Sequence, residues 1–188
     1  TTVQPRAAAV LGAVPRQTNP AKRVIKRNRA MAIAVPPLTP LRREWHDLRF
    51  GRDLVWTEGR YCLRNYKLRK TRHLPGREEY PGSIHPNVQH FVDARLLQDD
   101  DPKYLDALRD AAEEEEWPLF IHPDGTLVAE NYVSQVWSSE FGTGAHICRS
   151  IVYDVVFAIS EDATLAGTLN GQRLPGRLNQ RRETINIA

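Results

Sequence analysis

The chain has 188 residues, of which 41% are hydrophobic, and a formal net charge of +3. This length and composition allow one domain with one sizeable core. No apolar run is long enough to span a membrane, no signal-peptide pattern is present, and two cysteines are too few for a disulfide scaffold. We therefore expect a cytoplasmic protein with no membrane partner.

Charge is distributed unevenly along the sequence. No acidic residue precedes Glu44, whereas the same stretch holds the basic residues Arg6, Arg16, Lys22, Arg23, Lys26, Arg27, Arg29, Arg42 and Arg43. Acidic residues concentrate between Asp93 and Glu116. Such a chain can present a cationic face to a polyanion, although an ordinary solvated surface with a basic arm is an alternative interpretation.

The first part of the chain predicts an arm followed by helices. Residues 1–20 contain three prolines and no sustained hydrophobic period, which indicates a linker or basic arm ahead of a domain over residues 21–188. A helix is expected over Ala21–Val35, ended by Pro36 and Pro37. A second, short helix is expected over Arg42–Phe50.

The rest of the sequence predicts a small sheet followed by helices. Three short strands are expected over Leu54–Trp56, Arg60–Tyr66 and Thr71–Leu74, with a turn at Glu58 and Gly59. Helical patterns follow over Pro86–Leu97, Lys103–Glu116, Ala129–Phe141, Ala145–Ile159 and Asp162–Leu169. The expected fold class is mainly α with a small three-stranded antiparallel β-sheet.

The most informative motif is a His and an Arg three residues apart, His146 and Arg149, on a predicted helix. At this spacing the two side chains lie on the same face, one turn from each other. The planar Arg fork can bind two phosphate oxygens, and the His can donate a hydrogen bond to a third. Cys148, between them, is expected to be a small buried side chain rather than a nucleophile.

In its order of motifs the chain resembles the catalytic domain of tyrosine recombinases, the phage-integrase family. Before the His-Arg pair come Pro118-Leu119-Phe120, Asp124 to Leu127 and Tyr132-Val133-Ser134. Thr39-Pro40-Leu41-Arg42 is similar to the family's Thr-Gly-Leu-Arg turn, whose Arg is catalytic. Arg42 is the first candidate for that role and Arg43 the alternative, because Pro40 replaces a Gly and the usual acid is absent or shifted to Glu44.

The resemblance implies further site residues. Lys70, followed by Thr71 and Arg72, resembles the hairpin lysine that protonates the leaving oxygen, with Lys67 as the competing candidate. His146 and Arg149 match the family's HxxR pair. Gln172 stands where a second His normally donates to the phosphate. DNA contacts are expected from Arg43, Lys67, Arg72 and Arg173. The alternative for the hairpin, Arg64 to Arg72, is DNA backbone binding without chemistry.

One part of the family pattern is missing. The nucleophilic Tyr is expected near Arg181, and no Tyr is found there; Ala188 takes its place in a weaker alignment. Tyr153 is expected on the packed side of its helix. The Tyr lies beyond Ala188, has been replaced, or is absent because the protein binds DNA without cutting it.

The resemblance therefore implies DNA site-specific recombination or integration, with DNA strands broken and rejoined through a phosphotyrosyl link. The partner is double-stranded DNA, on which the chain forms a homo- or hetero-oligomer, a synaptic tetramer if active. The alternative is a catalytically inactive DNA-binding accessory or regulatory protein of the same fold. No metal or cofactor is expected, because the histidines form no HxxxH or HExxH pair.

Overall fold

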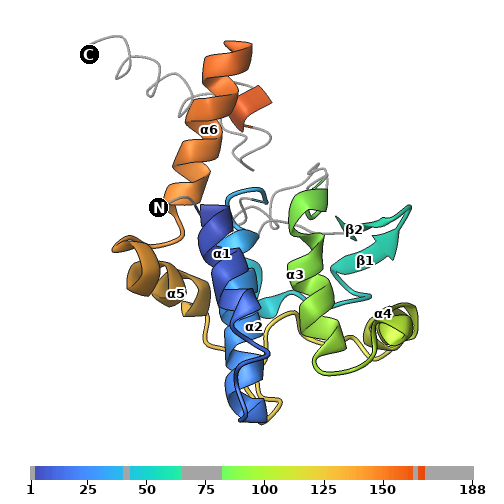
Figure 1. Cartoon of the computed structure of the whole chain (residues 1–188). Coiled ribbons are helices and arrows are strands. Elements are labelled where there is room, and N and C mark those ends of the chain that lie inside the picture. Colours follow the sequence, from blue (N-terminus) through green and yellow to red (C-terminus); the bar gives the residue numbers. More distant parts are fainter. Residues whose placement is uncertain (1–2, 40–42, 65–81, 163–164, 168–188) are drawn as a thin grey trace.

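The computed structural model describes residues 3–39, 43–64, 82–162 and 165–167. Helices dominate these residues, which confirms the mainly helical class (Figure 1). The elements are α1 (Val3–Gly12), α2 (Pro20–Ala34), the 3-10 helix η1 (Arg43–Asp47), β1 (Leu54–Thr57), β2 (Arg60–Leu63), α3 (Pro86–Leu97), the 3-10 helix η2 (Pro102–Tyr104), α4 (Leu105–Glu114), α5 (Tyr132–Phe141) and α6 (Ile147–Ser160).

The sheet has two strands among the described residues, so the expected count of three is wrong there. β1 and β2 pair in antiparallel fashion, with Leu54 opposite Leu63 and the predicted turn at Glu58 and Gly59 between them. The third strand, expected over Thr71–Leu74, lies outside the described residues. The chain instead reaches the other edge of β2 at Ser83, through an isolated antiparallel bridge to Cys62. Alternation in the sequence cannot show which backbone segment reaches a sheet edge.

Helix α2 is the centre of the core. Its start follows from local sequence, because the Asn19 side chain accepts a hydrogen bond from the backbone N–H of Ala21 and Pro20 occupies the first turn. Its last five residues, 30–34, are fully buried. Helices α1, α3 and α5 all pack against it. In Figure 1, α1 and α2 lie side by side between α5 and α3.

The segment expected to be a linker or basic arm contains a helix packed on the core. α1 lies along α2, Ala7 is completely buried, and the Gln4 side-chain amide donates to the Ala34 carbonyl oxygen at 3.0 Å. The prolines do not prevent it. Pro5 lies in the first turn, where its missing N–H is not needed, and Pro15 follows the end of the helix. Small alanines then let the two helices approach closely.

A polar cluster joins the β-hairpin to α3 and α4. Arg109 of α4 donates to Asp93 of α3 at 2.8 Å and to the hydroxyl of Tyr61 in β2 at 3.0 Å, while Tyr61 donates to the same Asp93 oxygen. The guanidinium also lies 3.6 Å from the centre of the Trp56 ring, a cation–π contact. Burial and the Asp93 contact raise the pKa of Tyr61 above its ordinary value. The cluster therefore fixes the hairpin with a neutral phenol.

Helix α6 extends away from the rest of the described chain (Figure 1). It carries exposed apolar side chains at Ile151, Val155 and Ile159. Its other side forms a small separate cluster in which Tyr153 packs with Ala166, a residue of the short helical segment 165–167. The helix expected over Asp162–Leu169 is described only at these residues.

Candidate functional site

The His146–Arg149 pair lies at the start of α6, as the sequence predicts. His146 is exposed, precedes the first helical residue and does not cap the helix with its side chain. Arg149 lies in the first turn and is buried, with an exposed fraction of 8%. Helical side chains lean toward the N-terminus, so an Arg in the first turn brings its charge toward the positive end of the helix. This end of α6 can therefore offer an anion an exposed imidazole backed by a cation.

Helix α5 anchors the segment that carries His146. The indole N–H of Trp137 donates to the Ala32 carbonyl oxygen of α2 at 2.8 Å. α5 ends at Gly142, whose left-handed backbone, with φ of +71°, reverses the chain toward His146. The backbone N–H groups of residues 147–149 then each donate to the carbonyl oxygen three residues back, so α6 begins with a tight turn. The position of His146 thus depends on the packing of α5 against α2.

Described contacts also hold the chain on the two sides of Arg42. Thr39, three residues before Arg42, is buried, and its hydroxyl donates to the Ser83 carbonyl oxygen at 3.3 Å. Ser83 lies just beyond the segment that contains Lys70. On the other side of Arg42, η1 packs against α5, the helix that leads to His146. The chain on the two sides of Arg42 is therefore held in place, at Thr39 by Ser83 and at η1 by α5.

Most of the other predicted site residues lie outside the part of the chain that the structure describes. These are Arg42, Lys67, Lys70, Arg72, Gln172 and Arg173. Arg43 is the first residue of η1. Convergence of Arg42, Lys70, His146 and Arg149 around one anion stays a prediction, as does the choice between Arg42 and Arg43 and between Lys67 and Lys70.

Cys148 and Tyr153, the two α6 side chains considered as nucleophiles from the sequence, are both buried. Cys148 is 2% exposed, and burial raises the pKa of its thiol to about 12, which confirms the expected inert side chain. Tyr153 is also 2% exposed and stacks on Phe157, with ring centres 6.2 Å apart. It lies on the packed side of α6, as expected. Neither group is placed to attack a phosphate outside the protein.

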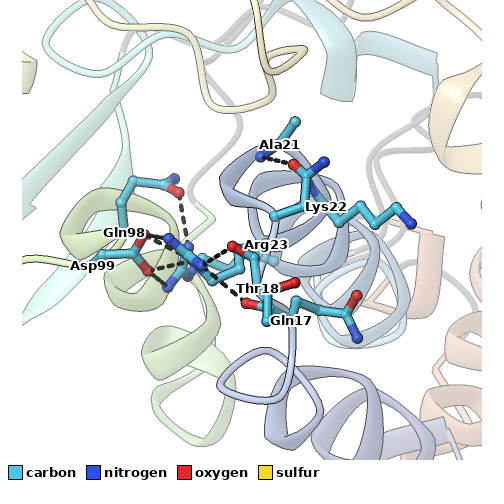
Figure 2. Close-up of polar contacts among 9 residues, drawn as sticks. Gln17, Thr18, Ala21, Lys22, Arg23, Gln98 and Asp99 are labelled. Atoms are coloured by element: carbon cyan, nitrogen blue, oxygen red, sulfur yellow. Dashed lines mark hydrogen bonds and ion pairs between the residues drawn. The ribbon is translucent and has the colours of Figure 1, made fainter.

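Several basic residues near the N-terminus are already engaged with acids. Figure 2 shows Arg23 of α2 bound to Asp99, which follows α3. Arg27 binds the same carboxylate at 2.6 Å, and hydrogen bonds from the two arginines hold the pKa of Asp99 below its ordinary value. Arg23 also donates to the carbonyl oxygens of Gln17 and Thr18. These charges stabilise the helix packing and leave less cationic surface for a polyanion than the sequence indicates.

A second acid, Glu140 of α5, binds two more of these arginines. Its carboxylate accepts from Arg6 of α1 at 2.7 Å and from Arg29 of α2 at 2.6 Å. Burial acts to raise the pKa of Glu140, but the two arginines outweigh it and hold the pKa below its ordinary value. No local pattern in the sequence indicates these partners, because Glu140 is 134 and 111 residues away from them.

Because Glu140 and Asp99 bind arginines as carboxylates, we expect the folded chain to lose stability in acid. The pKa of each carboxyl group is lower in the folded chain than in the unfolded chain. Its contribution to stability is therefore complete above the ordinary pKa and is lost as the pH falls through the folded pKa. The ordinary values are 4.5 and 3.8. We expect Glu140→Gln to lower the free energy of unfolding by about 1–2 kcal/mol at neutral pH. This difference from the parent should shrink below about pH 4.5 in urea unfolding curves.

Glu58→Gln is the matched control. The Glu58 side chain is 79% exposed, and its ion pair with Arg60 is long, at 3.5 Å, and contributes little to stability. It should change stability little at any pH. A Glu140→Gln deficit that persisted unchanged in acid would show that the carboxylate charge is not what stabilises the contact.

The described residues indicate neither a metal site nor a membrane span. They contain no group of three or more His, Cys, Asp or Glu side chains arranged to hold a metal ion. No helix among them is both long and apolar enough to cross a bilayer. A scan against protein-family models, a search of curated proteins and a search of solved structures each found no match.

Proposed function

We propose that this chain is a DNA-binding domain of the tyrosine recombinase type, acting in site-specific recombination or integration. The observation that carries the proposal is the start of α6, where an exposed His146 precedes a buried Arg149. The packing of η1, which follows Arg42, on α5, the helix that leads to His146, supports it. The substrate of this site is a phosphodiester of duplex DNA.

The chemistry of these side chains suits a phosphodiester. A phosphate accepts hydrogen bonds through its non-bridging oxygens, and charge develops there when phosphorus is attacked. Arg149 supplies a planar, permanently charged fork, and His146 supplies a ring N–H. The partial positive charge of the α6 N-terminus adds to both. In this proposal Arg42 and Lys70 complete the set, and the chain acts as a homo- or hetero-oligomer on DNA.

Arg149→Met is expected to weaken binding to duplex DNA by about tenfold, because a charge-assisted hydrogen bond to a phosphate is lost. Fluorescence anisotropy of a labelled duplex measures this. Arg149→Lys should recover part of the affinity, since it keeps the charge without the fork.

The matched control is Arg95→Met. Arg95, on α3, is likewise buried, with an exposed fraction of 4%. Its guanidinium donates to the Pro118 carbonyl oxygen and therefore already has a partner within the protein. Its replacement should leave DNA affinity unchanged, provided that thermal melting shows both variants folded. Equal losses in the two variants would mean that Arg149 acts only through the fold, and the proposal would lose its main support.

A catalytically inactive DNA-binding accessory or regulatory protein is the second candidate function. It is favoured by Tyr153, which is the only Tyr after His146 and is 2% exposed. A phenol nucleophile must reach phosphorus in line with the leaving oxygen. The described position of Tyr153 does not allow this.

We expect this chain to form no covalent complex with DNA. A nicked suicide substrate, from which the cut end diffuses away, traps any phosphotyrosyl link as a slow band on a denaturing gel. No such band should form with this chain, because no exposed Tyr follows His146 among the described residues. A slow band that disappeared in Tyr153→Phe would contradict this and would make Tyr153 the nucleophile.

A further inference from the structure

Gly144 lies beneath the imidazole of His146. A Cβ atom built on Gly144 would lie 2.9 Å from His146 Nδ1 and 3.3 Å from Cε1. The next nearest atom is Ser134 Cβ of α5, at 3.9 Å. The ring of His146 therefore folds back over the backbone at residue 144, into space that any side chain there would occupy.

The need for glycine at this position is one of space and not of backbone conformation. Gly142, two residues earlier, has a left-handed φ of +71°, and no atom lies within 4 Å of the place that a Cβ would take. Gly144 is the reverse case, because its backbone is one that any residue adopts, and its Cβ position is blocked by the ring. The two glycines of the Gly142-Thr143-Gly144 segment thus serve different purposes.

The orientation of the ring decides which nitrogen can reach a ligand. The Nδ1 and Cε1 edge lies against residue 144, whereas Nε2 is no closer than 3.9 Å to the blocked position. The Gly144 carbonyl oxygen also accepts from the Ile147 N–H at 3.2 Å, so the same residue holds the first turn of α6. Since His146 is exposed, Nε2 is the ring nitrogen left for contact with a molecule outside the protein.

We infer that Gly144 is a positioning residue that holds the His146 imidazole with Nε2 directed to the phosphate of bound DNA. The phosphate contact rests on the proposed function, whereas the ring orientation does not. A side chain at residue 144 would turn the ring away about its own rotatable bonds. It would do so at little cost in stability, because the ring is exposed and the φ of residue 144 suits alanine.

The first test follows the ring in the full chain without DNA. The Cε1–H signal of His146, identified by its loss in His146→Gln, is recorded in proton–carbon correlation spectra. Gly144→Ala should shift this signal and leave the other histidine signals in place. Gly12→Ala is the control, because no atom lies within 4 Å of its Cβ position, and it should shift none. An unmoved His146 signal in Gly144→Ala would overturn the inference.

The second test is a double-mutant cycle with a labelled DNA duplex. Gly144→Ala should weaken binding by about fivefold when His146 is present, the loss of one hydrogen bond. It should have no further effect in the His146→Ala background. Equal weakening in both backgrounds would overturn the inference, because Gly144 would then act without the ring. If the parent chain does not bind DNA at all, the proposed function fails, and the spectra alone decide the ring orientation.

Discussion

Raising the salt concentration from about 50 to about 200 mM is expected to weaken duplex DNA binding about a hundredfold. The reason is counterion release. Each neutralised phosphate contributes about 0.9 to the slope of log affinity against log salt, and we propose about four contacts. In this proposal they come from Arg149 and from Arg42, Lys70 and Arg72, which the resemblance to tyrosine recombinases implies. Anisotropy titrations at several salt concentrations give the slope directly.

Two variants show which cations contribute. Lys70→Gln should lower the slope by about 0.9, because one phosphate contact is removed. Arg6→Gln should leave it unchanged, since Arg6 lies on the surface but is bound to Glu140 at 2.7 Å. Binding that is insensitive to salt, or an Arg6→Gln variant with the larger effect, would contradict the assignment of the DNA contacts.

Gly51→Ala is expected to lower the free energy of unfolding by about 3 kcal/mol or more. Gly51 has a left-handed φ of +73°, and a Cβ there would lie 2.1 Å from the Glu113 carbonyl oxygen of α4. This neighbour is backbone, so it cannot turn aside. The hairpin would have to separate from α4, and the hydrogen bond from the Trp56 N–H to the Glu113 carboxylate would be lost. Urea unfolding measures the change.

Gly59→Ala separates the two causes. Gly59 has nearly the same backbone, with φ of +75°, but nothing lies within 4 Å of its Cβ position. Its replacement should cost only the strain of a left-handed alanine, about 1 kcal/mol. Equal losses at the two glycines would mean that backbone strain alone, and not the approach of α4, explains the effect at Gly51.

Elements that begin or end at strong local signals could be predicted from the sequence. α3 spans Pro86–Leu97, as predicted, because Pro86 starts it and the polar stretch after Leu97 ends it. α2 is also predicted to within one residue at each end, because Pro20 starts it and the prolines at 36 and 37 follow its end. α1 is not predicted because its prolines indicate a loop. Their positions at the first turn and beyond the end are compatible with a helix, and burial against α2 then favours one.

The pairing of distant charges could not be predicted. Arg27 and Asp99 are 72 residues apart, and Arg6 and Glu140 are 134 apart. The uneven charge of the chain suggests a free basic arm, but the fold brings Asp99, after α3, and Glu140, on α5, against arginines of α1 and α2. Ion pairing of this kind depends on the packing of α1, α2, α3 and α5 together, which no local pattern encodes.

By itself the sequence determined the mainly helical class, the hairpin turn at Glu58 and Gly59, and the place of His146 and Arg149 one turn apart. These follow from backbone preferences and hydrophobic period, which act over a few residues. The burial of Cys148 and Tyr153 is also expected from the sequence, but only the tertiary structure decided that His146 is exposed while Arg149 is buried. Burial is set by what packs around a helix: Cys148 of α6 joins the main core, and Tyr153 packs with Ala166, so these partners come from other parts of the chain.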